Sequence, residues 1–221
     1  MMTKNVTILG ANGQIARLVE DRLINEDKDI HLTLMLRNAS RLDYLKGNPQ
    51  VTIIDGDASS EVDLHKAIKG QDIVYVAFVD HSNGAELTQK TVEVMDEEGV
   101  KRLISSNILG IYDEVPGAFG DFNRNACFNG QVHDDDIVVL SDKYVEDSDL
   151  DYTVLRLAWL NDRADTNYTV THKGEEYVGV SVSRRACADV ISKIIEDPTK
   201  WSHESIGFAD PATQGSSRPV Y

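Results

Sequence analysis

A glycine-rich segment near the start of the chain constrains the fold more than any other feature. It reads Gly10-Ala-Asn-Gly-Gln-Ile-Ala16, a G-x-x-G-x-x-A spacing, and it directly follows a short apolar run at residues 6–9. Gly10 permits a tight turn off a strand, Gly13 lets the backbone approach a phosphate, and Ala16 is small enough for a helix to pack on a sheet. The spacing therefore predicts a strand, a turn and a helix whose first N–H groups hold the pyrophosphate of a dinucleotide. The residues expected to bind it are Gly10, Ala11, Asn12, Gly13, Gln14 and Ile15.

Short apolar runs alternate with longer amphipathic stretches along the rest of the chain. The runs lie at residues 6–9, 32–36, 51–55, 73–79, 102–105 and 152–157, and runs of this kind are typical of strands buried on both faces. Amphipathic patterns predict helices at 14–25, 60–70, 84–98 and 184–196, with Ser60 and Ser183 as caps. The pattern predicts one α/β domain over residues 1–221, with a doubly wound, mostly parallel sheet in the order 3-2-1-4-5-6 between two helix layers.

Two segments depart from this alternation. Residues 112–136 contain Pro116, several glycines and the triplet 134–136 of aspartates, with no clear period. We expect a long functional loop there, and the alternative is a solvated excursion or, at the triplet, a cap for a helix from about Ile137. Residues 214–221 have little to pack with, so we expect a flexible tail.

The charge balance and the cysteines limit the classes of partner. The chain carries 22 basic and 37 acidic side chains, a net charge of −15, which disfavours nucleic acid and anionic membrane surfaces as partners. The apolar run before Gly10 is too short for a signal peptide or a membrane span. Two distant cysteines and six scattered histidines lack metal-ligand spacing. We therefore expect a cytoplasmic protein without a bound metal.

The residue that follows the second apolar run indicates which dinucleotide is bound. Arg37 stands there, 27 residues after Gly10, and is followed by Asn38 and Arg41 rather than by an acidic residue that would bind the ribose of NAD. A guanidinium can hold a 2′-phosphate and stack on adenine, which predicts that NADP(H) is preferred over NAD(H). The alternative is an ordinary solvated arginine.

Residues at the ends of the third and fourth runs complete the predicted crevice. Asp57 can accept a hydrogen bond from the adenine amino group or cap the turn into the next helix, and the two roles are compatible. Ala58, Ala77 and Phe78 are expected to line the same crevice. Trp159, after the sixth run, either stacks over a substrate or packs in the core.

Together with residues 104–112 and 150–160, these motifs resemble the atypical short-chain dehydrogenases/reductases. The resemblance covers nearly the whole chain and is closest in kind to the nitrogen-metabolite-repressor-like, flavin-reductase-like and epimerase/dehydratase-like members. It implies a Rossmann fold that binds NADP(H), with the segment after Arg156 near the nicotinamide and a small C-terminal substrate lobe.

The catalytic residues that the resemblance implies are not all present. The family uses a tyrosine, a lysine four residues later and a serine, but none of the tyrosines here has such a lysine. Lys143 stands where the lysine is expected, and Val139, which cannot donate a proton, occupies the tyrosine position. The serine position falls near Ile108. Lys143 and Ser106 remain as catalytic candidates, and the proton donor is unassigned.

Three functions are compatible with these residues. The first is an NADPH-dependent oxidoreductase, monomeric or homodimeric, that acts on a small aromatic or conjugated acceptor, because the cofactor itself supplies the hydride. The alternative is a non-catalytic NADP(H) sensor, which the missing tyrosine permits. A nucleotide-sugar epimerase or dehydratase is disfavoured, since it needs the same tyrosine and a larger substrate lobe.

Overall fold

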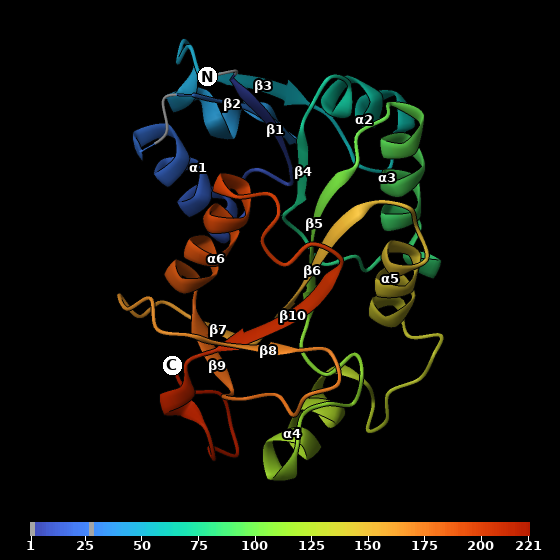
Figure 1. Ribbon diagram of the computed structural model, residues 1–221, viewed down its shortest axis with the longest axis vertical. Helices are drawn as coiled ribbons and strands as arrows, with labels where there is room; N and C mark the ends of the chain where they lie inside the picture. Colours follow the sequence, from blue (N-terminus) through green and yellow to red (C-terminus); the bar gives the residue numbers. More distant parts are fainter. Residues whose placement is uncertain (1–2, 27–28) are drawn as a thin grey trace.

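The central element is a sheet in the order β3-β2-β1-β4-β5-β6-β10-β8 (Figure 1). The computed structural model describes residues 3–26 and 29–221. Neighbouring strands are parallel, apart from the antiparallel pair β10–β8. The expected order 3-2-1-4-5-6 is confirmed, and β10 and β8 extend it. The strands are β1 (Lys4–Leu9), β2 (Ile30–Leu36), β3 (Val51–Asp55), β4 (Ile73–Val76), β5 (Arg102–Ile108), β6 (Asp151–Leu157), β8 (Thr169–His172) and β10 (Glu204–Ala209).

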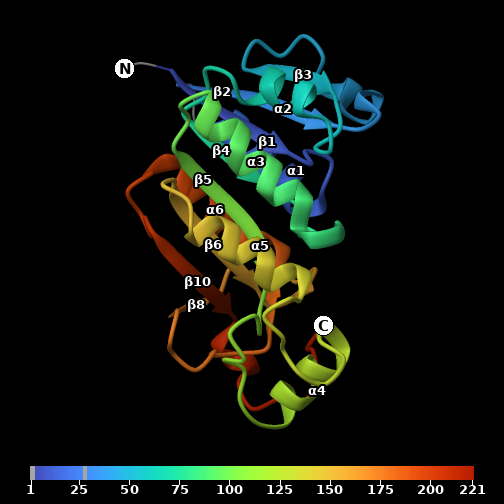
Figure 2. The same cartoon turned by 90° about the vertical axis from the view of Figure 1, so that its right-hand side faces the viewer.

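Helices cover both faces of this sheet, which confirms the three-layer Rossmann-like architecture. One face carries α1 (Gln14–Glu26) and α6 (Arg184–Glu196); the other carries α2 (Glu61–Ile68), α3 (Glu86–Glu97) and α5 (Ile137–Glu146), as Figures 1 and 2 show. Ser60 and Ser183 cap α2 and α6 by accepting hydrogen bonds from Asp63 N (3.3 Å) and Ala186 N (2.9 Å). Short 3₁₀ helices η1 (Ala39–Leu45), η2 (Asn83–Ala85) and η3 (Pro211–Thr213) lie in the connections.

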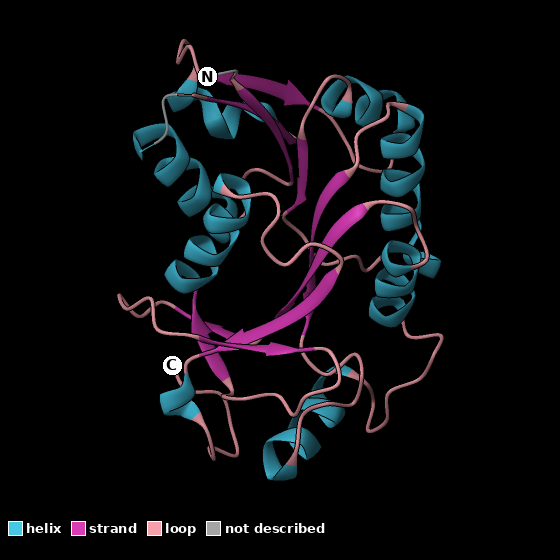
Figure 3. Cartoon of the chain, in the orientation of Figure 1, coloured by secondary structure: helices cyan, strands magenta, loops and turns pink. Residues whose placement is uncertain are grey.

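A small lobe adjoins the carboxyl ends of the central strands (Figure 3). It contains α4 (Gly117–Cys127) and the parallel pair of β7 (Trp159–Asn161) and β9 (Ser181–Ser183). Our expectation that 112–136 is a structureless loop is therefore wrong for 117–127. The buried positions of α4 are Phe119, Gly120 and Asn123, so the helix has no aliphatic stripe for a periodicity search to detect. A Cβ at Gly120 would lie 2.0 Å from the Val115 carbonyl oxygen, which explains why a glycine stands inside this helix.

The last residues of the chain make hydrogen bonds to this lobe. Asn161 Nδ2 donates to the Val220 carbonyl at 3.0 Å, and Val220 N donates to Ser181 Oγ at 2.8 Å. The Gln214 side-chain oxygen accepts from Gly179 N. The segment that we expected to have little to pack against is thus attached to β7 and β9.

No helix in the described part of the chain combines the length and apolar character that crossing a membrane requires.

Candidate cofactor-binding site

A cleft of about 540 Å³ lies where β1, β2, β3 and β4 end. The connections that follow these four strands meet there because the strands are parallel, and each contributes residues to the wall. The sequence-predicted residues that line the cleft are Gly10, Asn12, Gly13, Arg37, Asp57, Ala58 and Phe78. Ala11, Gln14, Ile15 and Ala77 lie next to it without lining it.

The glycine loop forms one wall of the cleft. Gly10 has a φ of 85°, and a Cβ there would lie 3.0 Å from Phe78 Cδ1, so both backbone conformation and space favour glycine. A Cβ at Gly13 would lie 3.4 Å from the Gly10 carbonyl oxygen and 3.6 Å from that of Ala77. The loop leads directly into α1, whose first turn holds no acidic side chain. This arrangement fits a pyrophosphate at the helix N-terminus, because the N–H groups and the helix dipole there are free to meet it.

Two arginines form the end of the cleft beyond β2. Arg37 is 80% exposed, and its Nη1 lies 3.9 Å from Asp57 Oδ2. Arg41 also lines the cleft, and its Nη2 donates to the Arg37 carbonyl at 2.5 Å. Arg41 therefore belongs to the site, although we noted it only as a neighbour of Arg37 in the sequence. Asp55, the acidic residue nearest to the β2 end, is engaged by Asn38 N at 2.9 Å.

Asp57 performs the capping role that the sequence suggested. Its Oδ1 accepts hydrogen bonds from Ser59 N and Ser59 Oγ, both at 2.9 Å. These hydrogen bonds lower the pKa of Asp57 below its usual value, so the carboxylate is charged at neutral pH. Its Oδ2 remains on the side of Arg37, where it is available to a ligand.

The connection after β4 supplies lining residues that we did not predict, Val79, His81 and Ser82, and the first turn of α3 supplies Leu87. Only their place in the sequence could have indicated these residues, since residues directly after a parallel strand lie at the crevice. His81, one of the six scattered histidines without metal-ligand spacing, is exposed at the cleft.

The two catalytic candidates do not line the cleft. Lys143 is exposed on α5, and Ser106 is buried in β5, where its hydroxyl lies beside that of Tyr75. Val139 instead packs, together with Val79 of the cleft, against a small apolar cluster of Ile111, Phe128 and Val138.

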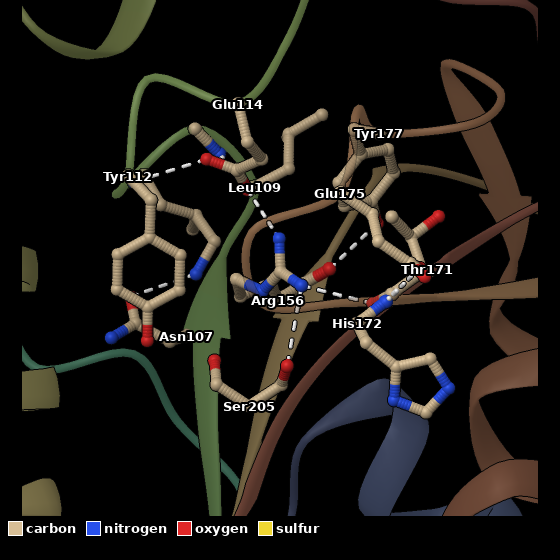
Figure 4. A network of polar contacts seen from close by, with 12 residues as sticks. Asn107, Leu109, Tyr112, Glu114, Arg156, Thr171, His172, Glu175, Tyr177 and Ser205 are labelled. Atoms are coloured by element: carbon tan, nitrogen blue, oxygen red, sulfur yellow. Dashed lines mark hydrogen bonds and ion pairs between the residues drawn. The ribbon is translucent and has the colours of Figure 1, made fainter.

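A buried polar network fixes the loop after β5 (Figure 4). Arg156 Nη1 contacts Glu114 Oε1 at 2.7 Å, and Nη2 donates to the Thr171 carbonyl at 2.9 Å. The Glu114 carboxylate also accepts from the backbone N–H groups of Gly110 and Tyr112, both at 3.0 Å. Arg156 therefore positions this loop rather than offering a charge to the cleft.

The same network reaches α5 through the Tyr112 side chain. Its hydroxyl lies 2.7 Å from Asp142 Oδ2 and 3.1 Å from Glu146 Oε1, and these two carboxylates share its one proton as acceptors. Burial, together with the Glu146 charge, raises the pKa of Asp142 to about 7, and burial also raises the pKa of Tyr112. Tyr112 is thus a weak acid in a structural position.

The Trp159 side chain packs within the small lobe. Its Nε1 donates to Asn123 Oδ1 at 3.0 Å, and its ring lies 5.2 Å from that of Phe122. In the part of the chain that the structure describes, no group of three or more His, Cys, Asp or Glu side chains is arranged to hold a metal.

The sheet order and the glycine cradle define a Rossmann-type nucleotide-binding protein. Residues 10–198 match the family described as NAD(P)H-binding, and the chain belongs to this family. A Rossmann-fold NAD(P)-binding family protein from Shigella flexneri is 33% identical, with 99% of each chain covered and a TM-score of 0.78.

Short-chain dehydrogenases/reductases are among the solved structures that resemble the chain. One from Veillonella parvula, in complex with NADP, is 26% identical, with 100% of each chain covered and a TM-score of 0.87. An anaerobillin reductase from Escherichia coli has the same fold at 18% identity, with 96% of this chain and 100% of that chain covered and a TM-score of 0.77. None of the curated proteins matches the chain. The Rossmann fold and the NAD(P)H-binding family that the resemblance implied are therefore confirmed, and both are consistent with an atypical short-chain dehydrogenase/reductase.

Proposed function

We propose that this protein is an NADPH-dependent oxidoreductase that acts on a small aromatic or conjugated acceptor. The observation that carries the cofactor preference is the pair Arg37 and Arg41, which lines the same cleft as the glycine cradle. Two guanidinium groups beyond β2 match a 2′-phosphate better than a free ribose hydroxyl. The Veillonella parvula structure that contains NADP supports the same cofactor.

Each wall of the cleft has a role in this proposal. The glycine loop and the start of α1 bind the pyrophosphate, and Arg37 and Arg41 bind the 2′-phosphate. Asp57 Oδ2 accepts a hydrogen bond from the adenine amino group. Phe78 and Val79 exclude water from the opposite side of the glycine loop. When bound, the cofactor supplies a hydride, and the protein supplies position and electrostatics.

One observation favours the second candidate, a non-catalytic NADP(H) sensor. Val139 stands at the tyrosine position, and neither Lys143 nor Ser106 lines the cleft. Such a protein would bind the cofactor without oxidising it.

Parallel calorimetric titration with NADPH and NADH, after removal of any copurified nucleotide, tests the cofactor proposal. We expect NADPH to bind at least tenfold more tightly. Equal affinities, or binding of neither, would overturn it.

Turnover is tested separately by following NADPH absorbance with menadione, FMN and dichlorophenolindophenol as acceptors. Oxidation of NADPH that depends on one of them supports a reductase. Tight NADPH binding without oxidation across this panel supports the sensor.

A further inference from the structure

The titratable side chains that line the cleft fall into two groups. Arg37, Arg41 and Asp57 lie beyond β2 and β3, and His81 lies beyond β4. The glycine loop, which follows β1, separates the two groups, because β1 stands between β2 and β4 in the sheet. A dinucleotide with its pyrophosphate on this loop and its adenosine toward Arg37 must extend its other half toward β4. His81 therefore lies on the side of the nicotinamide.

The turn that carries His81 is fixed by its neighbour Asp80, which is only 2% exposed. Asp80 Oδ1 accepts from Ser82 N (2.8 Å) and Ser82 Oγ (2.6 Å). Asp80 Oδ2 accepts from Thr88 N (2.7 Å) and Thr88 Oγ1 (2.8 Å). Thr88 Oγ1 lies 2.8 Å from Ser141 Oγ, which ties the turn to α5. The position of residue 81 is thus set by a buried carboxylate that makes four hydrogen bonds.

His81 also differs from its neighbours in having free ring nitrogens. Ser82 Oγ donates to Asp80 and accepts from Leu87 N at 3.1 Å, so this hydroxyl is engaged. The His81 ring is exposed, and no hydrogen bond or ion pair joins it to the residues described by the structure. Because the ring contacts solvent, a proton that His81 has donated can be replaced from water.

The surface next to His81 is apolar. Val79 lines the cleft, and behind it lies the buried apolar cluster of Ile111, Phe128 and Val138, against which Val79 packs. Within the cleft itself, Phe78 and Val79 are the apolar side chains of this connection, and neither carries a proton that it can donate.

We propose that His81 is the proton donor of the reaction, in place of the tyrosine that this chain lacks; the inference rests on the proposed reductase function. The acceptor takes a hydride, with its electron pair, from the reduced cofactor and a proton from the imidazolium of His81. The cofactor is thereby oxidised by two electrons and the acceptor is reduced by two. The neutral imidazole then recovers a proton from solvent, so one NADPH and one solvent proton are consumed per turnover.

The placement of His81 is tested by NMR without any turnover. The Cε1–H resonance of His81, assigned by its loss in His81→Gln, is followed during titration with NADP⁺ and, separately, with 2′,5′-ADP, which carries only the adenosine half. We expect NADP⁺ to shift this resonance and 2′,5′-ADP to leave it near its free position. Equal shifts with both ligands, or no shift with either while calorimetry shows NADP⁺ binding, would overturn the placement.

The chemical role is tested with the acceptor that the wild-type protein reduces. A general acid contributes about 10²- to 10⁴-fold, so His81→Gln should lower kcat by about 100-fold while the Kd for NADPH changes less than twofold. Added imidazole should restore part of the rate to His81→Ala. The control is His31→Gln, on the amino-terminal part of β2 where its ring contacts Thr52, and it should keep the wild-type rate.

Wild-type kcat in His81→Gln would refute the proton-donor role and leave the reductase function standing. If the wild-type protein reduces no acceptor, the reductase function and with it the donor role fail, whereas the NMR titration still decides where His81 lies.

Discussion

Arg156 and Glu114 form an ion pair at 2.7 Å in which the side chains are 0% and 5% exposed. The pair joins β6 to the loop after β5, and Glu114 uses the same carboxylate to hold the backbone of that loop. Removing one partner of a buried pair leaves the other charge without compensation, which typically costs about 3–5 kcal/mol.

Glu114→Gln should therefore lower the free energy of unfolding by roughly 3 kcal/mol, as measured by urea denaturation. The matched control is Asp121→Asn, which removes a surface partner of Arg124 at 2.6 Å where the aspartate is 73% exposed. We expect this change to cost less than about 1 kcal/mol. Equal losses for the two variants would show that burial does not set the strength of the Arg156–Glu114 pair.

Arg37→Ala should weaken NADP(H) binding much more than NAD(H) binding. Loss of a charged hydrogen bond to the 2′-phosphate corresponds to roughly 1.5–3 kcal/mol, which calorimetry would record as about a tenfold to hundredfold rise in Kd for NADPH. Arg185→Ala, an exposed arginine on α6, serves as the control and should alter neither affinity. A similar loss for both cofactors in Arg37→Ala would exclude the 2′-phosphate role.

Gly13→Val should abolish cofactor binding. The extra methyl groups would meet the Gly10 and Ala77 carbonyl oxygens, which already lie 3.4 and 3.6 Å from a bare Cβ, and would force the loop away from its phosphate-binding shape. The Cβ of an alanine at position 13 would make ordinary van der Waals contacts, so the Gly13→Ala variant should fold normally and bind the cofactor more weakly than the wild-type protein. Circular dichroism establishes folding and calorimetry establishes binding; retained affinity in the valine variant would remove the glycine loop from the site.

Glu20 should make stability depend on pH. It is 0% exposed on α1, its carboxylate oxygens have no hydrogen-bond partner among the described residues, and burial raises its pKa to about 8. The unfolded chain releases this proton near the ordinary glutamate pKa of 4.5, whereas the folded protein retains it up to a higher pH. The contribution of this proton to the free energy of unfolding is therefore complete below pH 4.5, and it is lost progressively as the pH rises through 8.

Glu20→Gln should remove this dependence. At pH 9 the variant should exceed wild type by on the order of a few kcal/mol, and near pH 4 the two should be equal. Urea denaturation at both pH values is the measurement, and Glu93→Gln on the exposed side of α3 is the control. Parallel stability curves for wild type and Glu20→Gln would contradict the assignment.

Local spacing was sufficient to predict the parts of the site that one short segment builds. The glycine loop, the start of α1 at Gln14 and the cap at Ser183 follow from neighbouring residues, and the structure has α1 and α6 where they were expected. The six-strand order is typical of a doubly wound sheet that opens with such a glycine loop, and the right-handed crossovers decide on which face each helix lies.

The missed features depend on contacts between distant segments. The antiparallel strand β8 is defined by its pairing with β10, from Thr169↔Ala209 to His172↔Ile206, and its own residues show no strong apolar run. Lys143 had the right sequence position, but the direction in which a helix residue points depends on how the helix packs. His81 lay in no motif, and only the meeting of four strand ends brings it to the cleft.

Asp80 sets the geometry of the β4–α3 turn through bonds to Ser82 and Thr88, and none of these involves the side chain at position 81. Residue 81 is therefore an exchangeable position on a fixed frame. A substitution there alters what the protein presents to a bound molecule while leaving the hydrogen bonds of the turn in place. For protein engineering, this makes position 81 a point at which new reactivity can be introduced independently of stability.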